Sequence, residues 1–159
     1  MTLMKPKNDI TLIWDEVPGD DIDRYEIYRS PYLPILHALG VGTNSFLINC
    51  IVKDWYKIGD VIEVTGSSVG NDGNYTIVNV TEGSAYTTIT VSETIPSLAY
   101  NDGYLGNPQI NQLAGSTKSH FYTDKDMPNG YYYYVIYAID IAGNYLNPSD
   151  IAIKYSEAY

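Results

Sequence analysis

The chain has 159 residues and a mass of 17.8 kDa, which suits one domain or one domain carrying a small second one. Nine Lys and Arg side chains against 19 Asp and Glu give a formal net charge of −10, which disfavours binding to nucleic-acid phosphates and to anionic membranes. No apolar run approaches the roughly 20 residues that span a bilayer. The 17 Tyr residues favour strands, and the single Cys excludes an internal disulfide.

The N-terminal part of the chain predicts two strands separated by a turn. Residues 10–14 form a short apolar run that ends in Trp14, and a segment rich in Pro, Gly and Asp follows it. Residues 24–29 then alternate with period 2, as in a half-buried strand. The alternation places Tyr25 and Ile27 on one face and Glu26 and Tyr28 on the other.

The middle of the chain predicts a series of short strands. Pro31 and Pro34 are expected to end the preceding strand, and residues 33–40 to form one helical turn. Turn sequences of the Asn-Asp-Gly type occur at 71–73 and 101–103. Their spacing is typical of a small sheet or barrel. The expected strands cover residues 46–52, 60–66, 75–80 and 86–91.

The C-terminal part predicts one long strand, a turn and a final strand. Residues 131–140 alternate, and residues 151–155 resume the strand pattern after the turn. One face of the long strand is expected to lie in a core, with Trp14, Tyr25 and Ile27. The inward residues are Tyr132, Tyr134, Ile136 and Ala138, and the outward residues are Tyr131, Tyr133, Val135 and Tyr137.

The two outer segments resemble a fibronectin type III domain over residues 8–32 and 117–157. The family pattern has a strand ending in Trp (Trp14), a strand of the form Tyr-x-Ile/Val-x (25–28), and a late Gly-x-Tyr motif that ends in Gly-Asn (130–144). The resemblance implies an all-β, Ig-like sandwich in which Tyr132 makes the tyrosine corner. It departs from the family in its short first strand, which would have to come from residues 1–7.

A block of about 75 residues separates the two outer segments and predicts an inserted β-module. A loop whose ends lie close together tolerates insertion, since closure cost rises only logarithmically with length. The block resembles small β-modules of tailed-bacteriophage structural proteins. The expected domains are a discontinuous sandwich of residues 1–33 and 115–159 and a module of residues 41–112.

No pattern in the sequence predicts an enzyme or a cofactor. His37 and His120 stand about 80 positions apart, and neither belongs to a recognisable catalytic motif. Cys50 is expected inside an apolar strand, as a small hydrophobic residue. Acidic residues in two loops are weak candidates for calcium ligands, although turns are rich in Asp. These candidates are Asp20, Asp21 and Asp23 in one loop and Asp124 and Asp126 in the other.

The outward tyrosines suggest a binding surface. Tyr131, Tyr133 and Tyr137, with Tyr28 near them, would form a protein interface, be covered by the inserted module, or stack on sugars. A sugar site would also use polar groups beside the rings, with Asn129 and Glu26 as candidates. The three alternatives remain open at this point.

The resemblances suggest a non-enzymatic structural protein of a tailed-phage virion, an accessory, adaptor or decoration subunit of head, neck or tail. The expected partners are other virion proteins and copies of the chain itself, without nucleic acid or membrane. The N-terminal residues carry no apolar stretch typical of a secretion signal, so we expect assembly in the host cytoplasm. The alternative is a carbohydrate-binding module that attaches to a bacterial surface glycan.

Overall fold

A computed structural model of the chain describes residues 8–19, 21–40, 43–110, 112–146 and 152–156. Within these residues the protein is all-β with a sandwich-like arrangement of sheets, which confirms the predicted fold class at this level. The described part contains no α-helix and one 3-10 turn, η1 (Lys53–Trp55). The chain divides into two compact units: unit 1 from Met1–Pro31 and Gln109–Tyr159, and unit 2 from Tyr32–Pro108.

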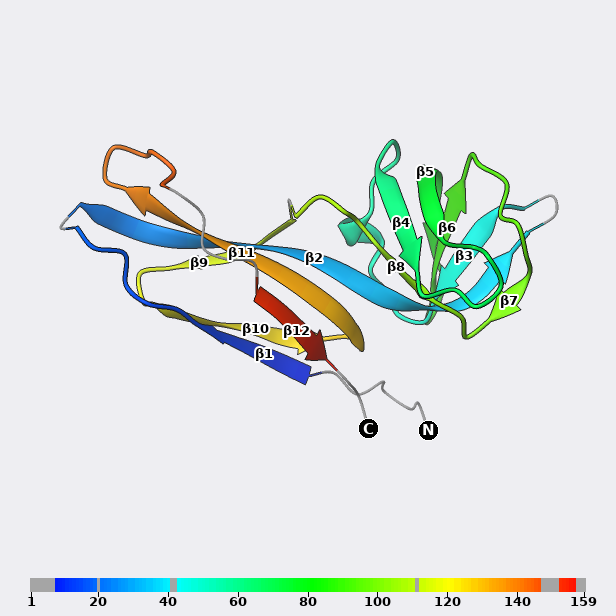
Figure 1. The fold of residues 1–159 in the computed structure, drawn as a ribbon, viewed down its shortest axis with the longest axis horizontal. Helices are drawn as coiled ribbons and strands as arrows, with labels where there is room; N and C mark the ends of the chain where they lie inside the picture. The colour runs from blue at the N-terminus through cyan, green and yellow to red at the C-terminus, as the bar shows by residue number, and fades with distance from the viewer. Residues whose placement is uncertain (1–7, 20, 41–42, 111, 147–151, 157–159) are drawn as a thin grey trace. The chain divides into compact units, whose positions relative to one another are not determined.

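Unit 1 contains two sheets whose strands come from both outer segments of the chain (Figure 1). In the first sheet, β1 (Asn8–Ile13) pairs antiparallel with β10 (Phe121–Met127). The second sheet uses the first half of β2, which continues into unit 2. The spatial order of the second sheet is β12 (Ala152–Ser156), β11 (Gly130–Asp140), β2 (Ile22–Leu39) and β9 (Gln112–Thr117).

The core of unit 1 follows the period-2 pattern of its strands. The inward positions of β1, β2 and β11 are buried, as expected when one face of a sheet packs against a second sheet. On the other face Glu26, Val135 and Ile139 are buried too, so Val135, predicted as an outward residue, is not exposed. The Tyr132 hydroxyl donates a hydrogen bond to the carbonyl oxygen of Pro128, four residues earlier, which satisfies a phenol that is otherwise buried. The buried side chains of this pattern are Ile10, Leu12, Tyr25, Ile27, Tyr132, Tyr134, Ile136 and Ala138.

Trp14 differs from the expectation that it is fully buried. The strand ends at Ile13, so the Trp14 side chain stands at the end of the sandwich and is half-buried. Its ring packs edge-to-face on Tyr25, with centroids 5.4 Å apart. Its backbone N–H donates to the carbonyl oxygen of His120 at 3.1 Å. Trp14 therefore closes one end of the core and is not its centre.

Unit 2 is built from the second half of β2 and the strands of the central block. Its antiparallel pairings run from β2 to β3, β6, β5, β4 and β8, and β8 pairs again with β2 (Figure 1). This ring of pairings gives each of these strands a neighbour on both sides. The bounds are β3 (Ser45–Ile48), β4 (Val61–Thr65), β5 (Gly73–Glu82), β6 (Thr87–Val91), β7 (Ala99–Tyr100) and β8 (Tyr104–Gly106).

The interior of unit 2 is apolar. The inward positions of its strands are aliphatic or aromatic and almost fully buried, as in a small barrel filled by side chains. Phe46 and Tyr75 meet edge-to-face inside, with ring centroids 5.1 Å apart. The other large buried side chains are Leu33, Ile35, Ile48, Ile62, Ile77, Ile89 and Leu105.

The structure corrects three predictions about strand boundaries. Residues 33–40 form no helical turn: β2 continues through Pro31 and Pro34 to Leu39, because the fixed φ of proline fits an extended chain. Pro34 still lies opposite Tyr104, and the next amide, that of Ile35, donates to the Gly103 carbonyl oxygen at 3.0 Å. The predicted strand 46–52 ends at Ile48, and β9 and β10 were not predicted at all.

Gly115 on β9 gives a test of the packing in unit 1. A Cβ atom at this position would overlap the ring and hydroxyl of Tyr122, which donates to the Ala114 carbonyl oxygen at 2.9 Å. We expect Gly115→Ala to lower the free energy of unfolding of unit 1 by about 1–3 kcal/mol, because the ring has to shift. Urea unfolding followed by Trp14 fluorescence, in a Trp55→Phe background, measures this unit alone. The exposed neighbour Ser116→Ala is the matched control, and equal stability of the two variants would contradict the expectation.

Candidate functional site

The outer face of the β12–β11–β2–β9 sheet carries a cluster of three tyrosines. Tyr137 on β11 lies between Tyr28 on β2 and Tyr145, which follows the turn after β11. The centroid of the Tyr137 ring is 5.6 Å from that of Tyr28 and 5.7 Å from that of Tyr145, and both contacts are edge-to-face. Tyr28 and Tyr137 are half-buried in this arrangement, whereas Tyr145 is exposed.

A buried carboxylate holds the two outer rings in place. The hydroxyls of Tyr28 and Tyr145 both donate to Oε1 of Glu26, at 2.9 and 2.7 Å. Arg24 donates to Oε2 of the same carboxylate through Nε at 3.2 Å and Nη2 at 3.0 Å. The Tyr145 hydroxyl and these further donors hold the pKa of Glu26 below its usual range. The hydrogen bond with Tyr145 and burial raise the pKa of the Tyr28 phenol.

The predicted outward tyrosine row is therefore divided into two parts. Tyr137 and Tyr28 face each other and Tyr145, so they do not form an open platform with the rest of the row. Tyr131 is exposed at 38 %, and Tyr133 is half-buried. The accessible part of the row consists of Tyr131 and Tyr133 near the start of β11, beside the half-buried Asn129.

A second polar network lies inside unit 1, between its two sheets. Arg29 on β2 donates through Nη1 to Oδ1 of Asp124 on β10 at 2.7 Å, and both side chains are largely buried. The Tyr134 hydroxyl donates to Oδ2 of Asp124 at 2.8 Å, and Arg29 Nε donates to the Gln112 amide oxygen at 2.9 Å. Burial and the neighbouring Asp124 raise the pKa of Tyr134.

The acidic residues predicted as calcium ligands do not form the predicted clusters. Asp124 is committed to Arg29 and Tyr134, and Asp23 pairs with Arg24 at 2.8 Å. Asp21 and Asp126 are exposed, and Asp20 lies outside the described residues. Within the described parts of the chain, no group of three or more His, Cys, Asp or Glu is arranged to hold a metal ion.

The histidines and the cysteine lie apart from these networks. His37 in unit 2 packs edge-to-face on Tyr100, with centroids 4.6 Å apart, whereas His120 in unit 1 lies 3.4 Å from a carboxylate oxygen of Glu16. Cys50 is half-buried just beyond the end of β3, and not inside a strand as predicted. Its carbonyl oxygen accepts the Thr87 hydroxyl at 2.7 Å.

An exposed apolar pair lies on the sheet of β1 and β10. Ile13 and Phe121 are direct cross-strand partners, and they are exposed at 78 % and 54 %. The next pair on the same face, Thr11 and Thr123, joins its hydroxyls at 3.1 Å. Such a cross-strand pair stabilises the pairing of its two strands, and here it also leaves apolar surface in contact with solvent.

Some of these residues could have been found from the sequence and others could not. Arg29 continues the inward alternation of Tyr25 and Ile27, and a charged residue at an inward position requires a buried partner. That signal was missed. Tyr145 carries no such signal, since its place beside Tyr137 depends on the turn at 140–144. Phe121 was missed together with β10.

Comparisons of the chain with protein family models, with curated proteins and with solved structures found no match. Among the described residues, no helix has the length and apolar character needed to cross a bilayer. The candidate site has three parts, all in unit 1. They are the rings of Tyr28, Tyr137 and Tyr145 beside the Glu26 carboxylate, the row of Tyr131 and Tyr133, and the exposed pair of Ile13 and Phe121.

The buried ion pair gives a sharp test of stability. We expect Asp124→Asn to lower the free energy of unfolding of unit 1 by about 3–5 kcal/mol, because Arg29 stays buried without its counter-charge. Asp126→Asn on the same strand is the matched control: Asp126 is exposed, and its positive φ of 57° suits Asn. The triple variant Arg29→Met/Asp124→Leu/Tyr134→Phe, which also removes the hydroxyl that Asp124 accepts, should recover most of the loss. Urea unfolding followed by Trp14 fluorescence measures all variants, and an Asp124→Asn protein as stable as the control would contradict the prediction.

Glu26 predicts a loss of stability in acid. Its pKa in the folded protein lies below its ordinary value of 4.5, so its contribution is complete above pH 4.5. The contribution is lost as the pH falls from 4.5 through the folded pKa, because the carboxylate is then protonated. The Glu26→Gln variant should be less stable than the parent at neutral pH, with a difference that shrinks below pH 4.5. Unfolding curves at several pH values measure the difference, with Asp15→Asn on an exposed loop as control. A difference independent of pH would contradict the prediction.

Proposed function

We propose that this chain is a non-enzymatic structural protein of a tailed-bacteriophage virion, an accessory, adaptor or decoration subunit of head, neck or tail. In this proposal unit 1 is a fibronectin type III-like sandwich and unit 2 is a β-module inserted into it. The partners are other virion proteins and further copies of the chain, and the site of action is the particle.

The arrangement of unit 1 supports the fibronectin-like part of the proposal. The strand order β12–β11–β2–β9, opposed by β1 and β10, is compatible with such a sandwich that lacks its first strand. The hydrogen bond from the Tyr132 hydroxyl to the Pro128 carbonyl oxygen has the form of a tyrosine corner. Unit 2 begins and ends within the chain of unit 1, as an insertion requires.

The main support for a role in assembly is the exposed apolar pair of Ile13 and Phe121 on the β1–β10 sheet. The outward faces of these side chains would be covered by a partner, and such burial stabilises an interface by about 25 cal/mol per Å² of apolar surface. Tyr131 and Tyr133 add aromatic area on the other sheet. Sugar stacking over the whole tyrosine row is less well supported, because Tyr28 and Tyr137 contact each other and Tyr145.

The decisive experiment is to search purified particles for this chain. Phage particles from a lysate of the host that carries the gene, purified by density gradient, should contain the chain in a fixed ratio to the major capsid protein. Quantitative mass spectrometry measures that ratio, and immunogold labelling locates the chain on head, neck or tail. Particles that lack the chain at every purification step would overturn the proposal.

The accessible tyrosines should contribute to incorporation into the particle. We expect Tyr131→Ala and Tyr133→Ala each to weaken incorporation by about 1–3 kcal/mol, because aromatic side chains in the centre of an interface carry much of the binding energy. The copy number per particle measures the effect when the variant and the parent chain compete during assembly. Ile58→Ala is the control, an exposed apolar residue on unit 2. Unchanged incorporation of both tyrosine variants would exclude this face from the interface.

A further inference from the structure

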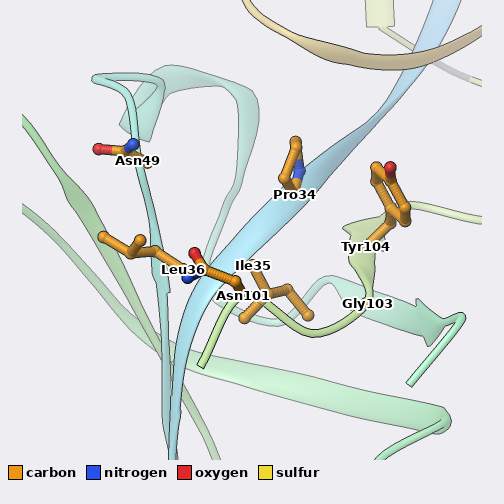
Figure 2. A pocket seen from close by; sticks show the side chains of 7 residues that line it. All are labelled: Pro34, Ile35, Leu36, Asn49, Asn101, Gly103 and Tyr104. Carbon is orange, nitrogen blue, oxygen red and sulfur yellow. The ribbon is translucent and has the colours of Figure 1, made fainter. Parts of the chain in front are cut away.

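A small pocket lies on unit 2 and is lined by residues of that unit alone. Its volume is about 170 Å³. Figure 2 shows the Tyr104 ring beside Pro34, its cross-strand neighbour, with the Asn49 amide on the side away from Tyr104. The lining residues come from β2, from the end of β3 and from the turn between β7 and β8. They are Pro34, Ile35, Leu36, Asn49, Asn101, Gly103 and Tyr104.

The turn that supplies Asn101 and Gly103 to the lining is held by several hydrogen bonds. The Asn101 backbone N–H donates to the Leu36 carbonyl oxygen at 2.8 Å, and Asn101 itself has a positive φ of 51°. The carboxylate of Asp102 accepts the Ser67 hydroxyl at 2.7 Å and both the backbone N–H and the hydroxyl of Ser68, at 2.9 and 2.7 Å. A pocket fixed by so many bonds needs little ordering when a ligand binds, which favours affinity.

Glycine at position 103 is required by the same turn. Its φ is +82°, and a Cβ atom would meet the carbonyl oxygen of Thr65 at 2.9 Å. The backbone can therefore approach β4 closely only because residue 103 has no side chain. The close approach places Asn101 and Tyr104 on either side of this glycine, at the pocket wall.

The lining selects a neutral, polar ligand. It contains no Asp, Glu, Lys, Arg or His, although the chain as a whole carries a net charge of −10. Tyr104 and Pro34 supply flat apolar surface, and the amides of Asn49 and Asn101 can each donate and accept hydrogen bonds. A sugar ring combines an apolar face with neighbouring hydroxyls that both donate and accept, so its chemistry matches this lining.

We propose that this pocket binds a neutral sugar residue, with one face of the ring against Tyr104 and its hydroxyls hydrogen-bonded to Asn101 and Asn49. The size of the pocket suits one ring of a longer glycan and not an extended peptide. The inference is independent of the proposed virion role, since it concerns unit 2 and does not use the apolar pair or the tyrosine row of unit 1.

Saturation-transfer NMR on the full chain tests the site with four probes: the methyl glycosides of glucose, galactose and mannose, and N-acetylglucosamine. At least one probe should give a saturable signal. Asn101→Gly should weaken that affinity by about tenfold or more, since it removes the amide and keeps the positive φ. Tyr104→Leu should do the same by removing the ring. Tyr100→Leu, an exposed tyrosine of the same unit outside the lining, should bind as the parent does.

Each other outcome overturns the proposal. Absence of a saturable signal for all four probes excludes a neutral monosaccharide site. A signal that survives both Asn101→Gly and Tyr104→Leu places the sugar elsewhere on the chain. Saturable binding of a proline-rich peptide with no sugar signal assigns the pocket to a peptide. Circular dichroism and Trp55 fluorescence confirm that each variant is folded, and Asn49→Ala replaces Tyr104→Leu if the latter unfolds unit 2.

Discussion

The organisation of unit 1 depends on one buried ion pair, Arg29 with Asp124. Two charges removed from water are stable only when both are present and their remaining hydrogen-bonding groups are satisfied. Tyr134 donates to the Asp124 carboxylate, and Gln112 accepts from the Arg29 guanidinium. The network therefore joins side chains of four strands, β2, β9, β10 and β11, inside an apolar core. A shift of β2 or β10 by one residue would separate the charges, and a shift of β9 or β11 would remove the hydrogen bond of Gln112 or Tyr134, so the network favours one register.

The fixed register also decides which side chains remain at the surface. Because Tyr134 points inward to Asp124, the odd-numbered residues of β11 lie on the other face, where Tyr131 is exposed but Val135 and Ile139 are buried. One part of that outer face is closed by Tyr28 and Tyr145 over Glu26, and the other part leaves Tyr131 accessible. The ring contacts in the closed part leave no open aromatic platform there, so Tyr131 and Tyr133 are the accessible rings of the row.

Unit 2 achieves order by other means. Its strand pairings return to β2, and its interior is filled by aliphatic and aromatic side chains without an ion pair among the described residues inside it. The polar bonds are found in its loops, where Asp102 binds Ser67 and Ser68 and the Asn71 amide exchanges hydrogen bonds with Ser97. A closed apolar interior with rigid loops can present a preformed pocket without reducing the stability of its core.

The sequence by itself determined the class of the fold and most of the strands. Period-2 alternation identified the inward positions of β2 and β11, since neighbouring side chains of a strand point to opposite faces, and the positions of Tyr25, Ile27, Tyr132 and Tyr134 agree with it.

Only the tertiary structure decided what depends on contacts between distant segments. The continuation of β2 through two prolines depends on a partner strand some 70 residues away, and β9 and β10 lack strong alternation of their own. Strand register, which local sequence patterns do not encode, pairs Arg29 with Asp124. Turn geometry places Tyr145 against the Tyr137 ring. Both together bring Asn49, Asn101 and Tyr104 to one pocket.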